Sequence, residues 1–265
     1  MKTTNKFLAL AAFMAVAMVF ASCSKDDNDP VGPTQQEIEA KIVGNWKELK
    51  RNGVDVLTNE RQIWTYFGNG KGTNSISCYK SIEGKYIYAN HKAIEYTLDG
   101  NKMYDKAIDM ECYSSITSID DTKMIATIEK LISNGMLVEK DDVVEYRKTS
   151  KDYSQDIIGM WEGVEITGYE TYGNAEHRIL YNADGTYVYF VKSGDNWVTS
   201  SNVDNEYNVD GDWLATRWRP EAGADYNYEW WDIDYIKDGM MKWSALREKE
   251  DGTRFTTTFT WKKVK

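Results

Sequence analysis

The chain has 265 residues and a formal net charge of −10, with 42 acidic against 32 basic residues. An acidic surface repels phosphate groups, so we expect no nucleic-acid partner. The length suits one large or two small domains.

Residues 1–22 have the features of a secretory signal peptide. Two lysines precede an uncharged run over residues 7–20, and a small Ala-Ser pair comes directly before Cys23. A helix that spans a bilayer needs roughly 20 apolar residues, so this run is too short for an uncleaved membrane anchor.

The stretch Val19-Phe20-Ala21-Ser22-Cys23 resembles a lipobox, the site at which bacterial lipoproteins are lipidated and cleaved. The resemblance implies that Cys23 carries a lipid such as palmitate and anchors the mature protein to a membrane. Residues 24–29 are similar to the Lys-then-acidic export signal of Bacteroidetes-type lipoproteins. That similarity implies display on the outer surface of the outer membrane; the alternative is a solvated spacer.

Residues 23–37 are predicted to be the lipidated cysteine and a flexible tether, because the segment is polar and contains prolines. A short helix is expected at Thr34 to Val43. Thr34 would cap it, and Glu37 follows three residues later as in a capping box.

The mature chain repeats one unit twice. Ile42-Val43-Gly44-Asn45-Trp46 recurs as Ile157-Ile158-Gly159-Met160-Trp161, at an offset of 115. Three further landmarks, which begin at Glu95, Ile116 and Val144, recur in the same order at similar offsets. We therefore predict two homologous domains, at 38–149 and 154–265.

Each unit has the pattern of a small antiparallel barrel or sandwich. Apolar residues alternate with polar ones at Phe255 to Trp261, and the dipeptides that begin at Asp99, Asp210, Asp238 and Asp251 are all Asp-Gly hairpin signals. Helical periodicity is weak, although Ser154 to Ile158 is a candidate counterpart of the opening helix. The fold class is predicted to be all-β.

Both units resemble the lipocalin-like domains of Bacteroidetes-type lipoproteins. The resemblance is carried by the opening Gly-x-Trp motifs at Gly44 and Gly159, by the aromatic strand and turn that follow each motif, and by the Tyr-x-x-Asp-Gly motifs at Tyr96 and Tyr207. It implies two tandem small β-barrels. At about 110 residues each unit is short for a roomy cavity, and side chains can fill such a small barrel.

Tryptophan is distributed unevenly between the units. The first contains Trp46 and Trp64, which leaves eight of the ten in the second. A small barrel cannot bury so many rings on one face, so we predict that the second domain presents an aromatic ligand-binding surface. Its predicted members are Trp213, Trp218, Tyr226, Tyr228, Trp230 and Trp231. Packing in the core or between the domains is the alternative explanation.

Signals for catalysis, metals or cofactors are weak. His91 and His177 lie far apart in the sequence and are expected at the surface, and no nucleophile or phosphate-loop motif is present. Asp232 and Asp234 form a candidate carboxylate pair, of a kind that arises by chance in an acidic chain. We expect no catalytic residues, metal or cofactor.

Cys78 and Cys112 are a possible disulfide, because the expected location is oxidising; two separate buried thiols are the alternative.

The sequence thus predicts a non-catalytic surface lipoprotein that binds a carbohydrate or an apolar small molecule, mainly through its second domain. The alternative is an accessory or structural lipoprotein that docks on an outer-membrane protein.

Overall fold

The computed structural model describes residues 32–75, 91–149, 151–168 and 176–265, which form two antiparallel sheets. Residues 32–265 belong to one compact unit. None of the described helices is both long and apolar enough to cross a membrane. The all-β prediction is confirmed.

The opening helix α1 (Gln35–Lys41) forms as the sequence predicts. Thr34 Oγ1 accepts a hydrogen bond from the Glu37 amide, and the Glu37 carboxylate accepts one from the Thr34 amide, so the capping box is complete. The helix therefore begins inside the stretch 23–37 that the sequence assigns to the tether. Its expected counterpart at Ser154 to Ile158 is only a turn.

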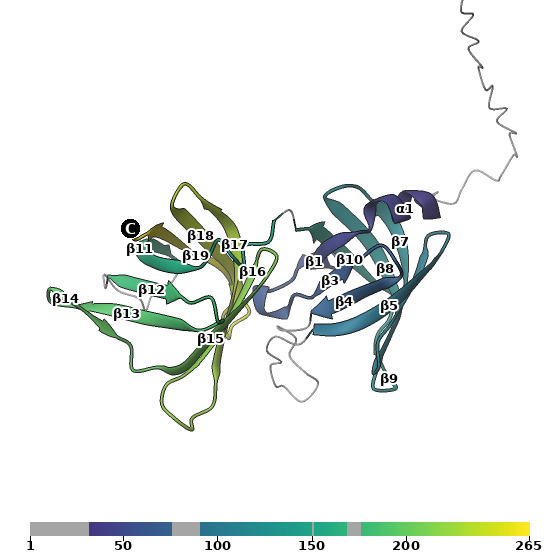
Figure 1. Cartoon of the computed structure of the whole chain (residues 1–265). Coiled ribbons are helices and arrows are strands. Elements are labelled where there is room, and N and C mark those ends of the chain that lie inside the picture. Colours follow the sequence, from purple (N-terminus) through teal and green to yellow (C-terminus); the bar gives the residue numbers. More distant parts are fainter. Residues whose placement is uncertain (1–31, 76–90, 150, 169–175) are drawn as a thin grey trace, which may run out of the picture. The chain divides into compact units, whose positions relative to one another are not determined.

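The first sheet closes into a barrel. Its strands are β1 (Gly44–Arg51), β2 (Val54–Asp55), β3 (Ile63–Tyr66), β4 (Lys71–Ser75), β5 (His91–Asp99), β6 (Lys102–Lys106), β7 (Met110–Ile119), β8 (Lys123–Ser133), β9 (Met136–Glu139) and β10 (Asp142–Lys148). β10 pairs with both β1 and β8, which joins eight strands in a ring; β2 and β9 extend from it (Figure 1). Closure removes the unpaired edges of the ring.

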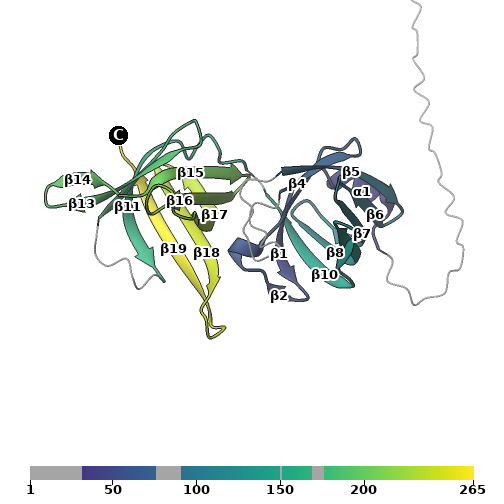
Figure 2. The ribbon, with the colours of Figure 1, turned by 90° about the horizontal axis from the view of Figure 1, so that it is seen from below.

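The second sheet has the same order of strands. They are β11 (Gly159–Thr167), β12 (His177–Tyr181), β13 (Tyr187–Ser193), β14 (Asn196–Thr199), β15 (Val203–Asp210), β16 (Trp213–Arg219), β17 (Asn227–Lys237), β18 (Met240–Glu248) and β19 (Arg254–Lys263). β11 and β19 pair as β1 and β10 do, and β17, β18 and β19 lie side by side in Figure 2.

Both barrels begin with the same local structure. The indole of Trp46 donates to the carbonyl oxygen of Ile42 (2.6 Å), and the indole of Trp161 donates to that of Ile157 (2.7 Å). Both tryptophans are 0% exposed, so they pack inside the barrels and are unavailable to a ligand. The four Asp-Gly dipeptides all lie at hairpin turns, with their glycines at positive φ.

An apolar cluster joins the outer faces of the two sheets. Ile63 on β3 packs with Trp213 and Ala215 on β16 and with Trp230 on β17. Side chains alternate along a strand, so Leu214, between Trp213 and Ala215, instead joins the core of the second barrel.

Buried charges surround this contact. Lys47 on β1 is 0% exposed, and its Nζ donates to Asp212 (2.6 Å) and Asp232 (2.7 Å) of the second sheet. Arg61 also pairs with Asp232, and Arg147 with Asp212 (2.7 Å). Burial alone would raise the pKa of Asp232, but Lys47 and Arg61 outweigh it and hold that pKa below its ordinary value.

Replacing Lys47 should therefore loosen the contact between the barrels. In Lys47→Met, two buried carboxylates lose their shared cation, and we expect a loss of about 3 kcal/mol in the free energy of unfolding. The matched control Lys50→Met changes a half-exposed lysine on the same strand and should cost less than about 1 kcal/mol. Urea unfolding compares them; equal losses would contradict this role of Lys47.

Candidate functional site

The two barrels differ at one seam. In the first, β4 and β5 pair continuously from Lys71↔Glu95 to Ser75↔His91. In the second, the corresponding β13 and β15 share a single bridge, Thr186↔Glu206. In the repeat, Thr186 and Glu206 correspond to Lys71 and Glu95. The wall of the second barrel therefore separates immediately after the one pair that both barrels share.

The residues at the seam differ between the two barrels. Gly72 packs closely in the first barrel, where an added Cβ would lie 2.2 Å from the carbonyl oxygen of Thr65 and 3.2 Å from Ile94. The position after the bridge in the second barrel is Tyr187, which places a ring where the first barrel has no side chain. β15 also contains a bulge at Asp204, which has a φ of 52° and shifts the register.

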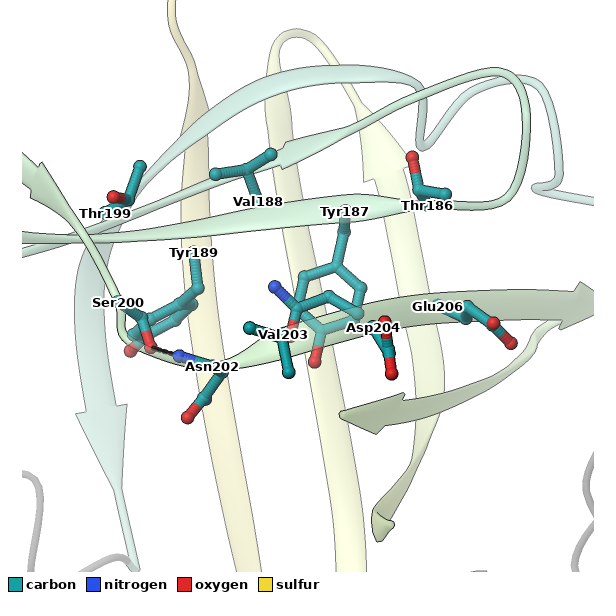
Figure 3. Close-up of a pocket in the computed structure, with 11 residues that line it drawn as sticks. Thr186, Tyr187, Val188, Tyr189, Thr199, Ser200, Asn202, Val203, Asp204 and Glu206 are labelled. Carbon is teal, nitrogen blue, oxygen red and sulfur yellow. Dashed lines mark hydrogen bonds between the residues drawn. The ribbon is translucent and has the colours of Figure 1, made fainter. Parts of the chain in front are cut away.

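The open seam forms a cleft of about 600 Å³ between β13 and β15. Figure 3 shows Tyr187 and Tyr189 pointing from β13 toward β15, whereas Val188 points away. The other lining residues supply hydroxyl, amide and carboxylate groups: Thr186, Thr199, Ser200, Asn202, Val203, Asp204, Asn205 and Glu206. Its volume and its mixture of rings and polar groups suit a small ligand.

Arginines neutralise the carboxylates of the cleft. Arg217 pairs with Glu206 (2.5 Å), and Arg219 lies 3.4 Å from Asp204. Both guanidinium groups also cover the ring of Tyr226, at 4.3 and 4.2 Å from its centroid. These contacts fix the acidic rim of the cleft in position and reduce its negative charge.

A second polar pair lies behind the cleft. The hydroxyl of Tyr189 and Nδ1 of His177 are 2.8 Å apart. His177 is only 6% exposed, so the expectation that it lies at the surface is wrong. Its position on β12 turns the imidazole inward, and this orientation depends on strand register. His91 is exposed, as expected.

The six predicted aromatic residues do not form one exposed surface. Trp213 and Trp230 are buried in the contact between the sheets, and Trp231 is buried in the core of the second barrel. These three rings are therefore occupied by packing, which corrects the predicted shared surface and agrees with the alternative given for it.

The remaining three residues are partly exposed around the β16–β17 hairpin. Trp218 lies near the end of β16, Tyr226 lies just before β17, and Tyr228 stacks on Trp230 at 5.9 Å. None of the three lines the cleft. Tyr226 alone is linked to the cleft by these ring contacts, since it packs on the two arginines that bind Glu206 and Asp204.

The candidate carboxylate pair is also divided by the fold. Asp232 binds Lys47 and Arg61, whereas Asp234 is exposed and accepts a hydrogen bond from the hydroxyl of Ser244 (2.6 Å). Within the described parts of the chain, no group of acidic, histidine or cysteine residues has the arrangement of a metal site.

The cysteine predictions remain predictions. Cys112 is buried on β7, and Cys78 lies outside the described residues. Cys23 and the signal peptide also lie outside them.

Sequence reasoning missed the seam cleft. A signal was available in the repeat, because Tyr187 occupies the position of Gly72 at the offset of 115.

Comparisons with known proteins do not assign a family. No family model and no curated protein matches the chain. Among solved structures, a protein of unknown function from the DUF3598 family of Nostoc punctiforme is 12% identical, with 87% of this chain and 99% of that one covered and a TM-score of 0.24. Transferrin binding protein B of Haemophilus parasuis is 10% identical, with 77% and 54% covered and a TM-score of 0.23. Similarity this low transfers neither fold nor function.

The first barrel contains a buried acid, which should make its stability depend on pH. Asp105 is 1% exposed, and burial raises its pKa to about 7, although a hydrogen bond from Tyr66 opposes the rise. The ionised form is thus disfavoured in the fold, so stability falls as pH rises from the unfolded pKa near 3.8 to about 7.

Asp105→Asn should remove this loss. We expect little change in melting temperature at about pH 4 and a clear rise at about pH 8, because the variant cannot ionise. The rise corresponds to a gain of at most about 4 kcal/mol in the free energy of unfolding. Thermal unfolding at both pH values tests this. A stabilisation equal at both would show that ionisation of Asp105 is not the cause.

Proposed function

We propose that the protein is a non-catalytic binding protein whose second barrel holds a small molecule or carbohydrate in the seam cleft. The observation that carries this proposal is the separation of β13 from β15, which produces a cleft of about 600 Å³ where the first barrel is closed. One unit therefore has a continuous wall, and the other has an opening that is lined by tyrosine rings and polar groups.

The chemistry of the cleft suits a neutral or weakly polar ligand. Aromatic faces pack on sugar rings or apolar bodies, and hydroxyl and amide groups exchange hydrogen bonds with the substituents. Glu206 and Asp204 add acceptors whose charge is already balanced by arginine.

The buried oxygen of Asn205 gives further support. Its Oδ1 has no hydrogen-bond partner among the described residues, although Asn205 lines the cleft. A buried acceptor without a partner is costly, so a donor on the ligand would gain a specific contact there.

We also propose that the second domain works at the outer surface of the outer membrane, tethered through a lipid on Cys23, with domains at 38–149 and 154–265. The signal-peptide pattern and the lipobox-like stretch support this proposal.

Cys23→Ser should release the protein from membranes. Without the acyl chains the mature chain loses its anchor, because each buried CH₂ contributes about 0.8 kcal/mol to membrane binding. Membrane fractionation and metabolic labelling with a palmitate analogue measure the change. A Cys23→Ser variant that stays in the membrane and still takes up label would exclude this anchor site.

Filling the cleft should abolish binding. Val203→Phe places a ring between β13 and β15, and we expect at least a tenfold loss of affinity for any oligosaccharide or apolar acid that the wild type binds. The matched control Val143→Phe makes the same change at an exposed site on β10 and should bind normally.

Calorimetric titration against a panel of both ligand classes provides the measurement. Normal binding by Val203→Phe would place the site elsewhere. Capture of a stoichiometric outer-membrane protein with no small-molecule ligand would instead favour the docking function.

A further inference from the structure

The two barrel interiors differ in the hydrogen bonding of one tyrosine hydroxyl. Tyr66 and Tyr181 occupy the same position in the repeat, since each is paired with the opening glycine of its own unit. Both are almost completely buried, at 2% and 0% exposed. In the first barrel the hydroxyl of Tyr66 has an internal acceptor, the carboxylate of Asp105.

The second barrel lacks this acceptor. Asp105 is paired with Tyr96, and the corresponding pair in the second barrel is Thr216 with Tyr207, so Thr216 replaces the aspartate. The hydroxyl of Tyr181 has no hydrogen-bond partner among the described residues. Burial raises the pKa of Tyr181 well above its ordinary value, so this hydroxyl keeps its proton at neutral pH.

Two indole N–H groups close to Tyr181 are also buried without a hydrogen-bond partner among the described residues. The rings of Tyr181 and Trp243 are 6.2 Å apart, and those of Trp243 and Trp261 are 5.0 Å apart. Both indoles are at most 4% exposed, and neither Nε1 has a hydrogen-bond partner within the described parts of the chain. We call Tyr181, Trp243 and Trp261 the donor cluster.

The donor cluster lies behind the seam cleft. Tyr187 lines the cleft, and its ring is 6.0 Å from that of Tyr181. A carboxylate on β17, Glu229, already pairs with Arg247 (3.9 Å), whose guanidinium lies 4.5 Å from the ring of Trp231. The surroundings therefore combine aromatic faces with buried donors, and an unsatisfied buried donor costs free energy that an incoming acceptor recovers.

We propose that the donor cluster recognises an acceptor oxygen, such as a carboxylate, sulfonate or carbonyl, on a ligand with an aromatic body. This inference rests on the function proposed above. The body packs against the rings behind the cleft, and the oxygen takes the place that Asp105 fills in the first barrel. The first barrel thereby satisfies this tyrosine internally, and the second is the binding unit.

Two fluorescent probes distinguish the contribution of the acceptor oxygen to affinity from that of the aromatic body. Anilinonaphthalene sulfonate carries acceptor oxygens, and phenylnaphthylamine has the same aromatic body without them. We expect the sulfonate to bind the folded full-length mature chain at least tenfold more tightly, by probe fluorescence. Tyr181→Phe should remove most of that preference. Equal affinity of the wild type for the two probes, or no binding of either, would overturn the proposal.

Variant stability supplies a readout that a purely structural role would not give. Without ligand, Tyr181→Phe should keep or raise the melting temperature, because it deletes an unsatisfied hydroxyl. The matched control Tyr66→Phe should lower it and leave probe binding unchanged, because its hydroxyl has a partner. A similar destabilisation in both would show that Tyr181 has an internal acceptor and overturn the assignment.

A gain-of-acceptor variant completes the test. Thr216→Asn supplies a carbonyl oxygen where Asp105 stands in the first barrel, and should weaken sulfonate binding while stabilising the free protein. If Val203→Phe blocks binding but neither Tyr181→Phe nor Thr216→Asn affects it, the cleft stands and the donor cluster is refuted. If Val203→Phe also has no effect, the proposed cleft itself fails.

Discussion

Pairing of the last strand of each sheet with its first strand, by backbone hydrogen bonds, is the constraint on which the rest of the structure depends. A strand edge exposes unpaired amide and carbonyl groups, and a barrel satisfies them by joining its first and last strands. In both units the last strand pairs with the first, so closure at this point is common to the repeat. The difference lies elsewhere on the ring, where β4 and β5 pair fully and β13 and β15 do not.

That difference is a matter of side-chain volume. At Gly72 no side chain enters the seam, and the side chain of Ile94 on β5 lies 3.2 Å from where a Cβ would stand, whereas Tyr187 brings a ring to the same position. The bulge at Asp204 shifts the register of β15 against β16 beside the same opening. Tyr187 and Asp204 both line the opening, so the residues that distinguish this seam from that of the first barrel also form the cleft.

The large aromatic content of the second unit serves three purposes. Trp161 closes the floor of the barrel, as Trp46 does in the first. Trp213 and Trp230 cover the outer face against Ile63, beside the buried pairs of Lys47. The interior rings pack around one another, and this packing holds donors at fixed positions with little conformational freedom.

By itself, the sequence determined the repeat, the all-β class, the capped helix at Gln35–Lys41 and the four Asp-Gly turns, because these depend on local periodicity and on single-residue preferences. Only the tertiary structure decided which tryptophans are covered, where the wall opens and which buried donors lack acceptors. Trp213 and Trp218 look alike in the sequence, yet one packs against Ile63 and the other is partly exposed. Burial and hydrogen-bond partners depend on strands distant in the chain, such as the pairing of Gly163 with Trp261, and no local pattern specifies those partners.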